Sequence, residues 1–558
     1  MNRHADHIES LEKIFRGKPQ RLEWLSLLPS EMKWESTAVV LRNTTFETVE
    51  MGASPLSKFL GHKVHWIYSS YDASLPQIES LLGEKRCDLV VLWMDWSFLE
   101  TRAPEEQKRF VNQTMERIAD AHSGPILANL WKSTSPLQKI LVTEFEKNAR
   151  LIAIDVEEIS ALNGVAAFDT RSSEITKSCF SKEFDLTFAR TLTCSIWPAL
   201  AGAQLRGIII DLDHTAYRGV LGEDGLDGIE FTPTHKRIWK RLAELKQQGF
   251  LLAISSKNDL EDVKRLLALP SVALNFEDFA VVAANWNSKA ENIRTILTKF
   301  NFSPEYVLFI DDNPNELLNV KSEIPGLQVM RADSEGLATL LALHDYPGVR
   351  RTHTDSAAAL RTADIQANEK RVELSSRMKG SKHDYLKELQ IEILIEKDRF
   401  EVVERIADLA KKTNQFNLTF ARTEREKIDG LLTEKSGHVY SLALCDRFSN
   451  SGVVGGALVE KIEELATFSE FLFSCRALGR DAETVFFQEM LKDLESEGIT
   501  EVELKVVKGP KNQPAMDWLK TLDIGEGLTR LPIDEMTARC RKLLNNYPAK
   551  ITWKANAQ

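Results

Sequence analysis

The stretch Gly207–Thr215, GIIIDLDHT, decides how the middle of the chain folds. A short apolar run ends just before Asp211, and Asp213 follows, so a buried strand leads into a turn that carries two carboxylates. In open α/β sheets, ligands bind beyond the carboxyl ends of the strands. The stretch therefore predicts a strand of a parallel sheet with a polar site at its end.

Two further apolar stretches of the same region also end in polar residues. FLLAISSKND places Ser255 and Ser256 after one strand, and FIDDNP places Asp311 and Asp312 after another. Between them, NWNSKAENI supplies Lys289. Clustered carboxylates repel one another unless a cation lies between them, and hard oxygen ligands favour Mg²⁺. Because phosphoryl transfer needs charge stabilisation and in-line positioning, the ordered set predicts a magnesium-dependent phosphoryl-transfer site.

The spacing of these stretches leaves no room for a separate lid domain. About 40 residues separate Asp211 from Ser255, and about 30 separate Ser256 from Lys289, and a helix and a strand fill most of each interval. We therefore expect an open site. An open site suits a bulky partner, such as a carrier protein, better than a small metabolite that must be sequestered.

Length and composition set the class of protein. The 558 residues are too many for one hydrophobic core, and a net charge of −11 argues against a nucleic-acid-binding surface. The start of the chain does not resemble a signal peptide, and no apolar run is long enough to span a membrane. The 6 cysteines form no CxxC pair, which favours a reducing compartment. We expect a cytoplasmic protein that binds neither nucleic acid nor membranes.

Alternating strand-like and helical stretches predict an α/β fold of three domains. Residues 1–200 and 201–345 each show strands separated by helices, which is typical of parallel sheets. Residues 346–388 are polar and of mixed charge, and we expect a helical linker there. Residues 389–558 show strands of antiparallel type before a helix, which predicts an α+β domain.

DLDHT resembles the first motif, DxDxT, of the haloacid dehalogenase (HAD) superfamily. The resemblance implies a Rossmann-like domain that lacks a cap. It implies that Asp211 is the nucleophile that accepts the phosphoryl group and that Asp213 is the acid/base.

The same resemblance implies a metal site and a phosphate site. The ligands of Mg²⁺ would be Asp211, Asp213 through its main-chain carbonyl, Asp311 and Asp312. Ser256 and Lys289 would hold the phosphoryl oxygens, with Ser255 as the alternative hydroxyl.

A closer resemblance extends from Asp211 to Arg480. DLDHTAYRGVLGEDG is similar to DLDNTLWGGVLGEDG of the FkbH-like subgroup (HAD subfamily IIIC), and KKTNQFNLT, DRFSNSGVVGG and FSCRALGR resemble its later blocks. The resemblance implies a biosynthetic enzyme that loads a glyceryl unit from 1,3-bisphosphoglycerate onto the phosphopantetheine thiol of an acyl carrier protein, with loss of phosphate.

This chain departs from the subgroup pattern just after the nucleophile. His214 replaces the usual Asn, and Ala216, Tyr217 and Arg218 replace Leu-Trp-Gly. We expect these positions to face the substrate. Arg218 binds a second phosphate or carboxylate, or it is a surface-turn arginine.

The loop CRALGRDAE of the third domain resembles the R/QxxGxG/A loop of GNAT acyltransferases, whose amides meet the pyrophosphate of coenzyme A at a helix start. Arg476 and Gly479 match, and Arg480 follows them. Asp481 stands where glycine or alanine is usual, and its carboxylate would repel a diphosphate. We therefore predict a domain that docks a carrier-protein arm instead of binding coenzyme A; the alternative is a domain with a packing role only.

Cys475 begins this loop and is our candidate for a transient glyceryl thioester, although many cysteines are only small apolar residues. Asn414, Gln415 and Asn417 form an amide cluster that contacts substrate or satisfies backbone groups in a turn.

The first domain, residues 36–200, resembles the SGNH-hydrolase-like domain found at the amino terminus of this family. Its nucleophile turn, LRNTTFE, has Thr44 and Thr45 but no serine, and no DxxH follows near Phe168–Asp169. Hydrolysis has no mechanism without serine and histidine. We expect a non-catalytic domain that binds a partner or covers the HAD site.

The function predicted from the sequence is therefore a carrier-protein loading enzyme whose Asp211 removes phosphate. Two alternatives stay open: a magnesium-dependent phosphatase for a small phosphate ester, and a non-catalytic carrier-binding protein.

Overall fold

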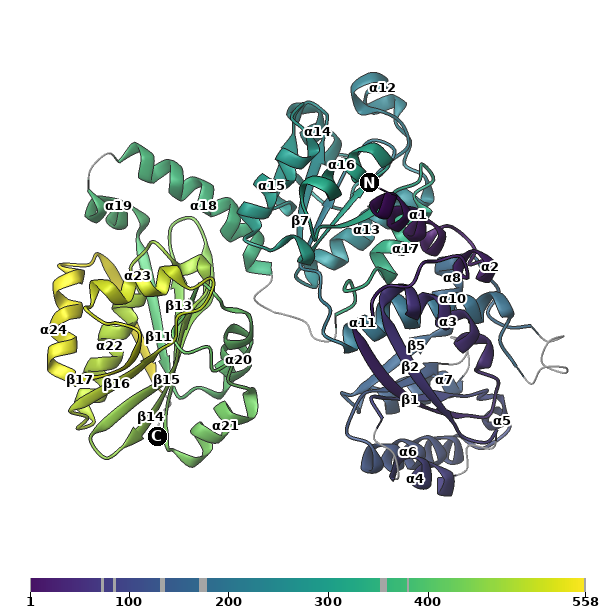
Figure 1. Cartoon of the computed structure of the whole chain (residues 1–558), viewed down its shortest axis with the longest axis horizontal. Coiled ribbons are helices and arrows are strands. Elements are labelled where there is room, and N and C mark those ends of the chain that lie inside the picture. Colours follow the sequence, from purple (N-terminus) through teal and green to yellow (C-terminus); the bar gives the residue numbers. More distant parts are fainter. Residues whose placement is uncertain are drawn as a thin grey trace. The chain divides into compact units, whose positions relative to one another are not determined.

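The computed structural model describes residues 2–71, 75–83, 87–130, 136–169, 178–351, 359–378 and 381–555. The chain forms two compact units, Met1–Thr354 and Asp355–Gln558 (Figure 1). The first unit contains two five-stranded sheets and the second unit contains one eight-stranded sheet. The predicted α/β fold is confirmed.

The first sheet has the strand order β2-β1-β3-β4-β5, and all its strands are parallel. Its strands are β1 (Trp34–Arg42), β2 (His62–Tyr68), β3 (Leu89–Trp93), β4 (Ile126–Leu130) and β5 (Leu151–Asp155). Its helices are α3 (Glu47–Leu60), α4 (Leu75–Gly83), α5 (Ser97–Glu100), α6 (Pro104–Ala121), α7 (Pro136–Phe145), α8 (Val156–Asn163) and α10 (Lys182–Arg190). Successive residues of β1 enter different core clusters, Ala38 and Val40 on one face and Val39 and Leu41 on the other. Both faces are therefore buried, as parallel sheets require.

The second sheet, also parallel, has the order β10-β9-β6-β7-β8. Its strands are β6 (Gly207–Ile210), β7 (Leu251–Ser256), β8 (Val281–Ala284), β9 (Val307–Asp311) and β10 (Gln328–Arg331). Its helices are α12 (Leu221–Gly228), α13 (Pro233–Gln247), α14 (Leu260–Leu267), α15 (Lys289–Phe300), α16 (Pro314–Glu323) and α17 (Leu337–Asp345). The chain passes from β6 to β7 and β8 on one side and then returns to β9 on the other. The strand order thus reverses between β6 and β9, which is where such sheets bind ligands.

The amino-terminal helix α1 (Asn2–Phe15) packs against the second sheet, although the sequence places it in the first domain. Leu11, Ile14 and Phe15 share one core cluster with residues of β6, α13 and α17. A short helix, α2 (Arg21–Trp24), leads from α1 to β1. The hydrophobic face of α1 therefore ties the start of the chain to the second sheet.

A buried ion pair also joins the two sheets of the first unit. Helix α10 continues into a π-helix, η1 (Thr191–Ile196), and then α11 (Trp197–Leu200). Arg190, at the end of α10, lies 3.5 Å from Asp345 at the end of α17, and Thr191 donates a 2.9 Å hydrogen bond to the same carboxylate. Both ion-pair partners are buried, so each charge depends on the other for compensation.

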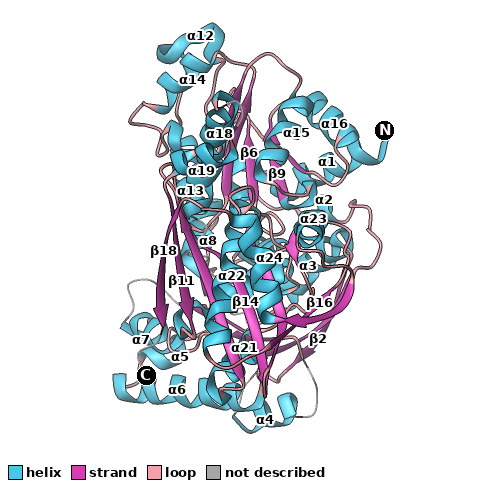
Figure 2. Cartoon of the chain, turned by 90° about the vertical axis from the view of Figure 1, so that its left-hand side faces the viewer, coloured by secondary structure: helices cyan, strands magenta, loops and turns pink. Residues whose placement is uncertain are grey.

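The sheet of the second unit has the order β17-β16-β15-β14-β13-β11-β18, and the short β12 pairs with β15. Its strands are β11 (Ile391–Lys397), β12 (Phe416–Asn417), β13 (Gly437–Cys445), β14 (Asn450–Ile462), β15 (Leu465–Phe473), β16 (Glu501–Val506), β17 (Gly527–Pro532) and β18 (Ala549–Ala555). Helices α22 (Ala482–Ser496), α23 (Gln513–Thr521) and α24 (Ile533–Leu544) share a core with one face (Figure 2). Helices α20 (Val403–Lys412) and α21 (Arg425–Glu434) pack on the other face.

Helix α18 (Ala359–Arg377) packs on β14, and α19 (Lys382–Leu389) leads into β11. Part of the segment predicted as a linker is therefore built into the second unit. None of the described helices is long and apolar enough to cross a membrane.

Removal of the Asp345 carboxylate tests the joint between the two sheets of the first unit. Asp345→Ala leaves Arg190 buried without its ionic partner and should lower the free energy of unfolding by about 3–5 kcal/mol. Urea unfolding followed by tryptophan fluorescence measures this loss. The control Glu335→Gln removes an exposed ion pair with Arg218 and should cost less than about 1 kcal/mol. Equal effects of the two changes would contradict the assignment.

Candidate active site

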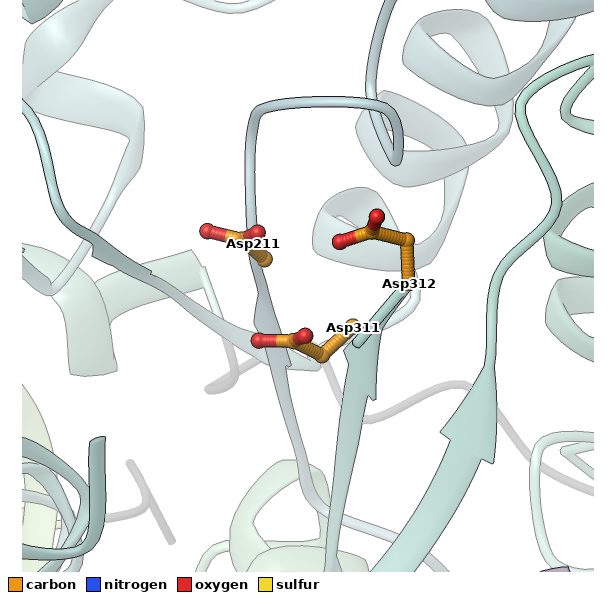
Figure 3. A group of neighbouring side chains, drawn as sticks. All are labelled: Asp211, Asp311 and Asp312. Carbon is orange, nitrogen blue, oxygen red and sulfur yellow. The ribbon is translucent and has the colours of Figure 1, made fainter. Parts of the chain in front are cut away.

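Three carboxylates meet where the strand order of the second sheet reverses. Asp211 follows β6, Asp311 ends β9, and Asp312 is the next residue. One carboxylate oxygen from each lies within 4.8 Å of the others, and the three side chains gather beside the two strand ends (Figure 3). The cluster forms because an aspartate follows β6 and another ends β9, and the two strands are parallel neighbours.

Lys289 is the positive charge of this cluster. Its Nζ lies 2.5 Å from Asp211 Oδ1 and 3.2 Å from Asp311 Oδ2, and it donates a 2.6 Å hydrogen bond to the main-chain oxygen of Ser255. Lys289 begins α15, and the Ser288 hydroxyl caps that helix. The lysine side chain is only 4% exposed, so it is held in one place by the helix start and by its three acceptors.

The charge balance of the cluster fits a divalent cation. Three carboxylates face one ammonium, which leaves two negative charges uncompensated. Burial raises the pKa of Asp211 and of Asp311, and burial together with the charge of Asp211 raises that of Asp312. A cation bound between them would reverse these shifts. Carboxylate oxygens at this spacing fit Mg²⁺, held by Asp211, Asp311 and Asp312, and Mg²⁺ bound there would supply charge stabilisation to phosphoryl oxygens.

Asp213 is held by three hydrogen-bond donors. Tyr217 Oη donates to Asp213 Oδ1 at 2.6 Å, and the Leu221 amide donates to the same oxygen at 2.9 Å. Asn258 Nδ2 donates to Asp213 Oδ2 at 2.8 Å and also to Ser256 Oγ at 2.9 Å. The carboxylate therefore has a fixed orientation, and Ser256 belongs to the same hydrogen-bond network.

This network distinguishes Ser256 from Ser255, the two candidates for the hydroxyl that holds a phosphoryl oxygen. Ser256 presents its hydroxyl to Asn258, whereas Ser255 contributes its main-chain oxygen to Lys289. The Ser255 hydroxyl is buried and makes no hydrogen bond to the described residues. The geometry favours Ser256 as the hydroxyl of the site.

The residues that depart from the subgroup pattern do not all face a substrate, so that expectation is wrong for two of them. Ala216 is fully buried. Arg218 pairs with Glu230 at 2.5 Å and with Glu335 at 2.6 Å, so it is the surface-turn arginine. Tyr217 is also buried, but its hydroxyl contacts Asp213. His214 has φ 52°, a left-handed conformation that favours Asn, Asp and His among non-glycine residues.

Sequence reasoning missed the roles of Tyr217 and Asn258 as partners of Asp213. Asn258 stood in the quoted stretch ISSKND, and its position two residues after Ser256 was the available signal. Tyr217 carried no local signal, because only the folded turn shows that its hydroxyl points inward.

The predicted carrier-binding loop of the second unit holds its arginines internally. Arg480 lies 2.6 Å from Asp446, and Arg476 lies 3.4 Å from Asp364 on α18. Both guanidinium groups are largely buried, at 2% and 11% side-chain exposure. Gly479 has φ 82° and permits the turn. The predicted cofactor role of Arg476 and Arg480 is therefore not supported by their geometry.

Cys475 differs from these arginines because it is exposed. It begins the short 3₁₀ helix η5 (Cys475–Ala477), and the preceding Ser474 caps that helix. A thiol in this position is accessible to an acyl donor.

Strand β12 lies between the ends of β15 and β16. The parallel pairing of β15 with β16 runs only from Leu465 to Phe468 on β15. Beyond it, β12 pairs with β15, and the Val507 amide donates to the Leu418 oxygen at 2.8 Å. The chain therefore fills the space between these two strands with its own backbone.

The predicted amide cluster serves local turns. Asn417 Oδ1 accepts hydrogen bonds from the amides of Thr419 and Phe420, and Asn414 Oδ1 accepts one from Arg422. Of the two alternatives for Asn414 and Asn417, the contacts favour the turn role.

In the first domain, Thr44 is buried beside Cys179, with 3.7 Å between Thr44 Oγ1 and Cys179 Sγ. Burial raises the pKa of the Cys179 thiol to about 12, so it is not a thiolate nucleophile. Phe168 pairs with Phe180, and residues 170–177 lie outside the described part of the chain. The absence of catalysis in this domain stays a prediction.

No family model matches the sequence, and a search of curated proteins found no significant match. Among solved structures, the N-terminal part of BF1531 from Bacteroides fragilis, described as containing a phosphatase domain complexed with Mg, matches 62% of this chain and 99% of its own, with 19% identity and a TM-score of 0.46. Over 25% of this chain, the ribosomal-protein-S18-alanine N-acetyltransferase from Escherichia coli matches with 12% identity, a TM-score of 0.20 and 94% of its own chain covered. Tetrahymena GCN5 matches 25% of this chain and 95% of its own, with 10% identity and a TM-score of 0.18.

Loss of one carboxylate tests the metal site. Asp311→Asn removes a charge from the cluster and should weaken Mg²⁺ binding by about tenfold or more, as measured by isothermal titration calorimetry. The matched control is Asp262→Asn on α14, whose carboxylate pairs with Arg265, and it should bind Mg²⁺ as the unchanged protein does. Unaltered affinity in Asp311→Asn would rule out this cluster as the site.

The second unit should not bind coenzyme A, because Arg476 and Arg480 are paired internally and β12 fills the space beside β15. Calorimetric titration should show a Kd weaker than about 1 mM, with an acetyltransferase of known affinity as the control. Binding in the micromolar range would show that the loop opens.

Proposed function

We propose that the chain loads a glyceryl unit from 1,3-bisphosphoglycerate onto the phosphopantetheine thiol of an acyl carrier protein and removes phosphate at Asp211. The observation that carries the proposal is the cluster of Asp211, Asp311, Asp312 and Lys289 at the reversal of strand order, with Asp213 held beside it. The resemblance of the sequence from Asp211 to Arg480 to the FkbH-like subgroup supplies the acyl chemistry.

The phosphate-removing half uses only residues of the second sheet. The Asp211 carboxylate attacks phosphorus, the bond from phosphorus to the substrate oxygen breaks, and Asp213 gives that oxygen a proton. Water, losing a proton to Asp213, then attacks the aspartyl phosphate and releases inorganic phosphate. Lys289 and Ser256 hold the phosphoryl oxygens during both displacements.

The acyl half uses the exposed thiol of Cys475. The thiol attacks the acyl phosphate carbon, a carbon–sulfur bond forms, and phosphate leaves. The carrier thiol then displaces Cys475 and takes the acyl group. In sum, 1,3-bisphosphoglycerate, the carrier thiol and water give a glyceryl thioester and two phosphates.

A second candidate is a magnesium-dependent phosphatase for a small phosphate ester. The internal pairing of Arg476 and Arg480 favours it, because these residues no longer identify a binding loop in the second unit. The phosphatase shares the whole Asp211 site with the loading enzyme.

Two variants separate the two halves of the reaction. After incubation with Mg²⁺, 1,3-bisphosphoglycerate and a holo carrier protein, the unchanged chain should give a glyceryl-carrier mass. Asp211→Asn should instead leave the phosphoglyceryl carrier, because the phosphate ester is no longer cleaved. Cys475→Ser should give no acylated carrier while still releasing phosphate from esters.

Cys445→Ser, a change of another partly exposed cysteine of the same unit, is the control and should load normally. If phosphate esters are cleaved but no carrier gains mass, the chain is a phosphatase. If neither occurs and Mg²⁺ has no effect, it is a non-catalytic binding protein.

A further inference from the structure

A cleft of about 300 Å³ lies between strand β2 and helix α3 of the first sheet. Its lining comes from three parts of the chain: Glu50, Ser54 and Lys58 of α3, Val64 and Trp66 of β2, and Met32 of the segment that leads into β1. The apolar members are accessible, because Val64 and Trp66 are half-buried and Met32 is 60% exposed. The function proposed above does not use this cleft.

Strand β2 stands at the edge of its sheet. It is the outermost strand in the order β2-β1-β3-β4-β5, and within the described part of the chain it pairs only with β1. The other side of its backbone can therefore pair with a further strand. Val64 and Trp66 are two positions apart and share a core cluster with α3 residues, so both point to the α3 side of the sheet. A strand added at this edge would place alternate side chains over the cleft.

Helix α3 and strand β2 run along the cleft in opposite directions. Gly61, with φ 72°, turns the chain from α3 directly into β2. Tyr68 Oη, at the end of β2, donates a 2.5 Å hydrogen bond to Glu50, near the start of α3. From the rise per residue of a strand and of a helix, the lining part of β2 is about 13 Å long and that of α3 about 12 Å long. The two walls therefore match the length of about four residues of extended chain.

The end of the cleft where α3 meets β2 favours an acidic group. Lys58 is exposed and makes no ion pair or side-chain hydrogen bond with another described residue. Lys63 also lines this end and pairs with the exposed Glu35 at 3.3 Å. Burial lowers the pKa of His62 beside them to about 4, so its ring is neutral. Because Glu50 lies at the opposite end, a carboxylate of a ligand is best placed beside Lys58.

We propose that the cleft binds an extended acidic segment of a partner protein, which adds to β2 as a further strand of the sheet. Alternate apolar side chains of the segment contact Val64, Trp66 and Met32, and a carboxylate lies beside Lys58. A second copy of β2 does not fit this description, because its sequence, HKVHWIY, has no acidic residue. The site is separate from the carboxylate cluster and does not depend on the glyceryl-loading proposal.

Selection of short linear peptides from a random display library on the full chain tests the site. The recovered peptides should combine an acidic residue with alternating apolar residues and bind with a Kd of about 10–100 μM by fluorescence anisotropy. Lys58→Glu should weaken binding by about tenfold or more. Ser54→Trp fills the cleft from an exposed position and should remove binding.

The matched control is Lys108→Glu, a change of an exposed lysine on α6, which packs on the other face of the sheet. It should bind the peptides as the unchanged protein does, and thermal unfolding followed by circular dichroism should show that all three variants are folded. If no acidic peptide is recovered, or if Lys58→Glu and Lys108→Glu bind equally well, the proposal is wrong.

Methylation of single backbone nitrogens of the best peptide tests strand addition itself. Every second amide of an added strand bonds to β2, so methylation there should weaken binding by about tenfold, and methylation of the intervening amides by less than about twofold. An equal loss at every position, no loss, or a helical circular dichroism signal from the bound peptide would overturn strand addition. A dimer that Ser54→Trp converts to a monomer, measured by light scattering, would show that a second copy occupies the cleft instead.

Discussion

The second sheet depends on one electrostatic constraint: Lys289 must stay between Asp211 and Asp311. Three carboxylates at two adjacent strand ends would repel one another in a buried site without a positive charge. The ammonium is brought there by the start of α15 and by the main-chain oxygen of Ser255. The residual negative charge would favour a divalent cation, and the same lysine would face a phosphoryl group bound beside that cation.

The two units hold different kinds of reactive side chain. The first unit holds carboxylates, an ammonium and a hydroxyl, which suit charge-stabilised phosphoryl transfer. The second unit holds an exposed thiol on a loop whose arginines are used internally by Asp364 and Asp446. These ion pairs stabilise the loop, and β12 fills the space beside β15 with backbone.

Much of the site could be predicted because strand ends are encoded locally. Asp211 and Asp311 each follow an apolar run, and parallel strands bring such ends to one edge. The place of Lys289 in the site could be predicted because NWNSKAENI lies between the stretches that carry Ser256 and Asp311. The partners of Arg480 and Arg476 could not be predicted, because Asp446, which opens the block DRFSNSGVVGG, and Asp364 are distant in sequence from the two arginines, and neither carries a signal for an ion pair. The packing of α1 on the second sheet was missed for the same reason: amphipathic spacing shows that a helix is buried, not which sheet buries it.

The Arg190–Asp345 pair has a consequence for how the first unit meets a partner. Because this buried joint and α1 connect both sheets within one compact unit, the first sheet is tied to the sheet that carries Asp211. A partner protein bound to the first sheet would therefore stand at a set distance from the nucleophile. For such a partner, the length of the arm that it carries, and not its affinity alone, would decide whether its cargo reaches the carboxylates.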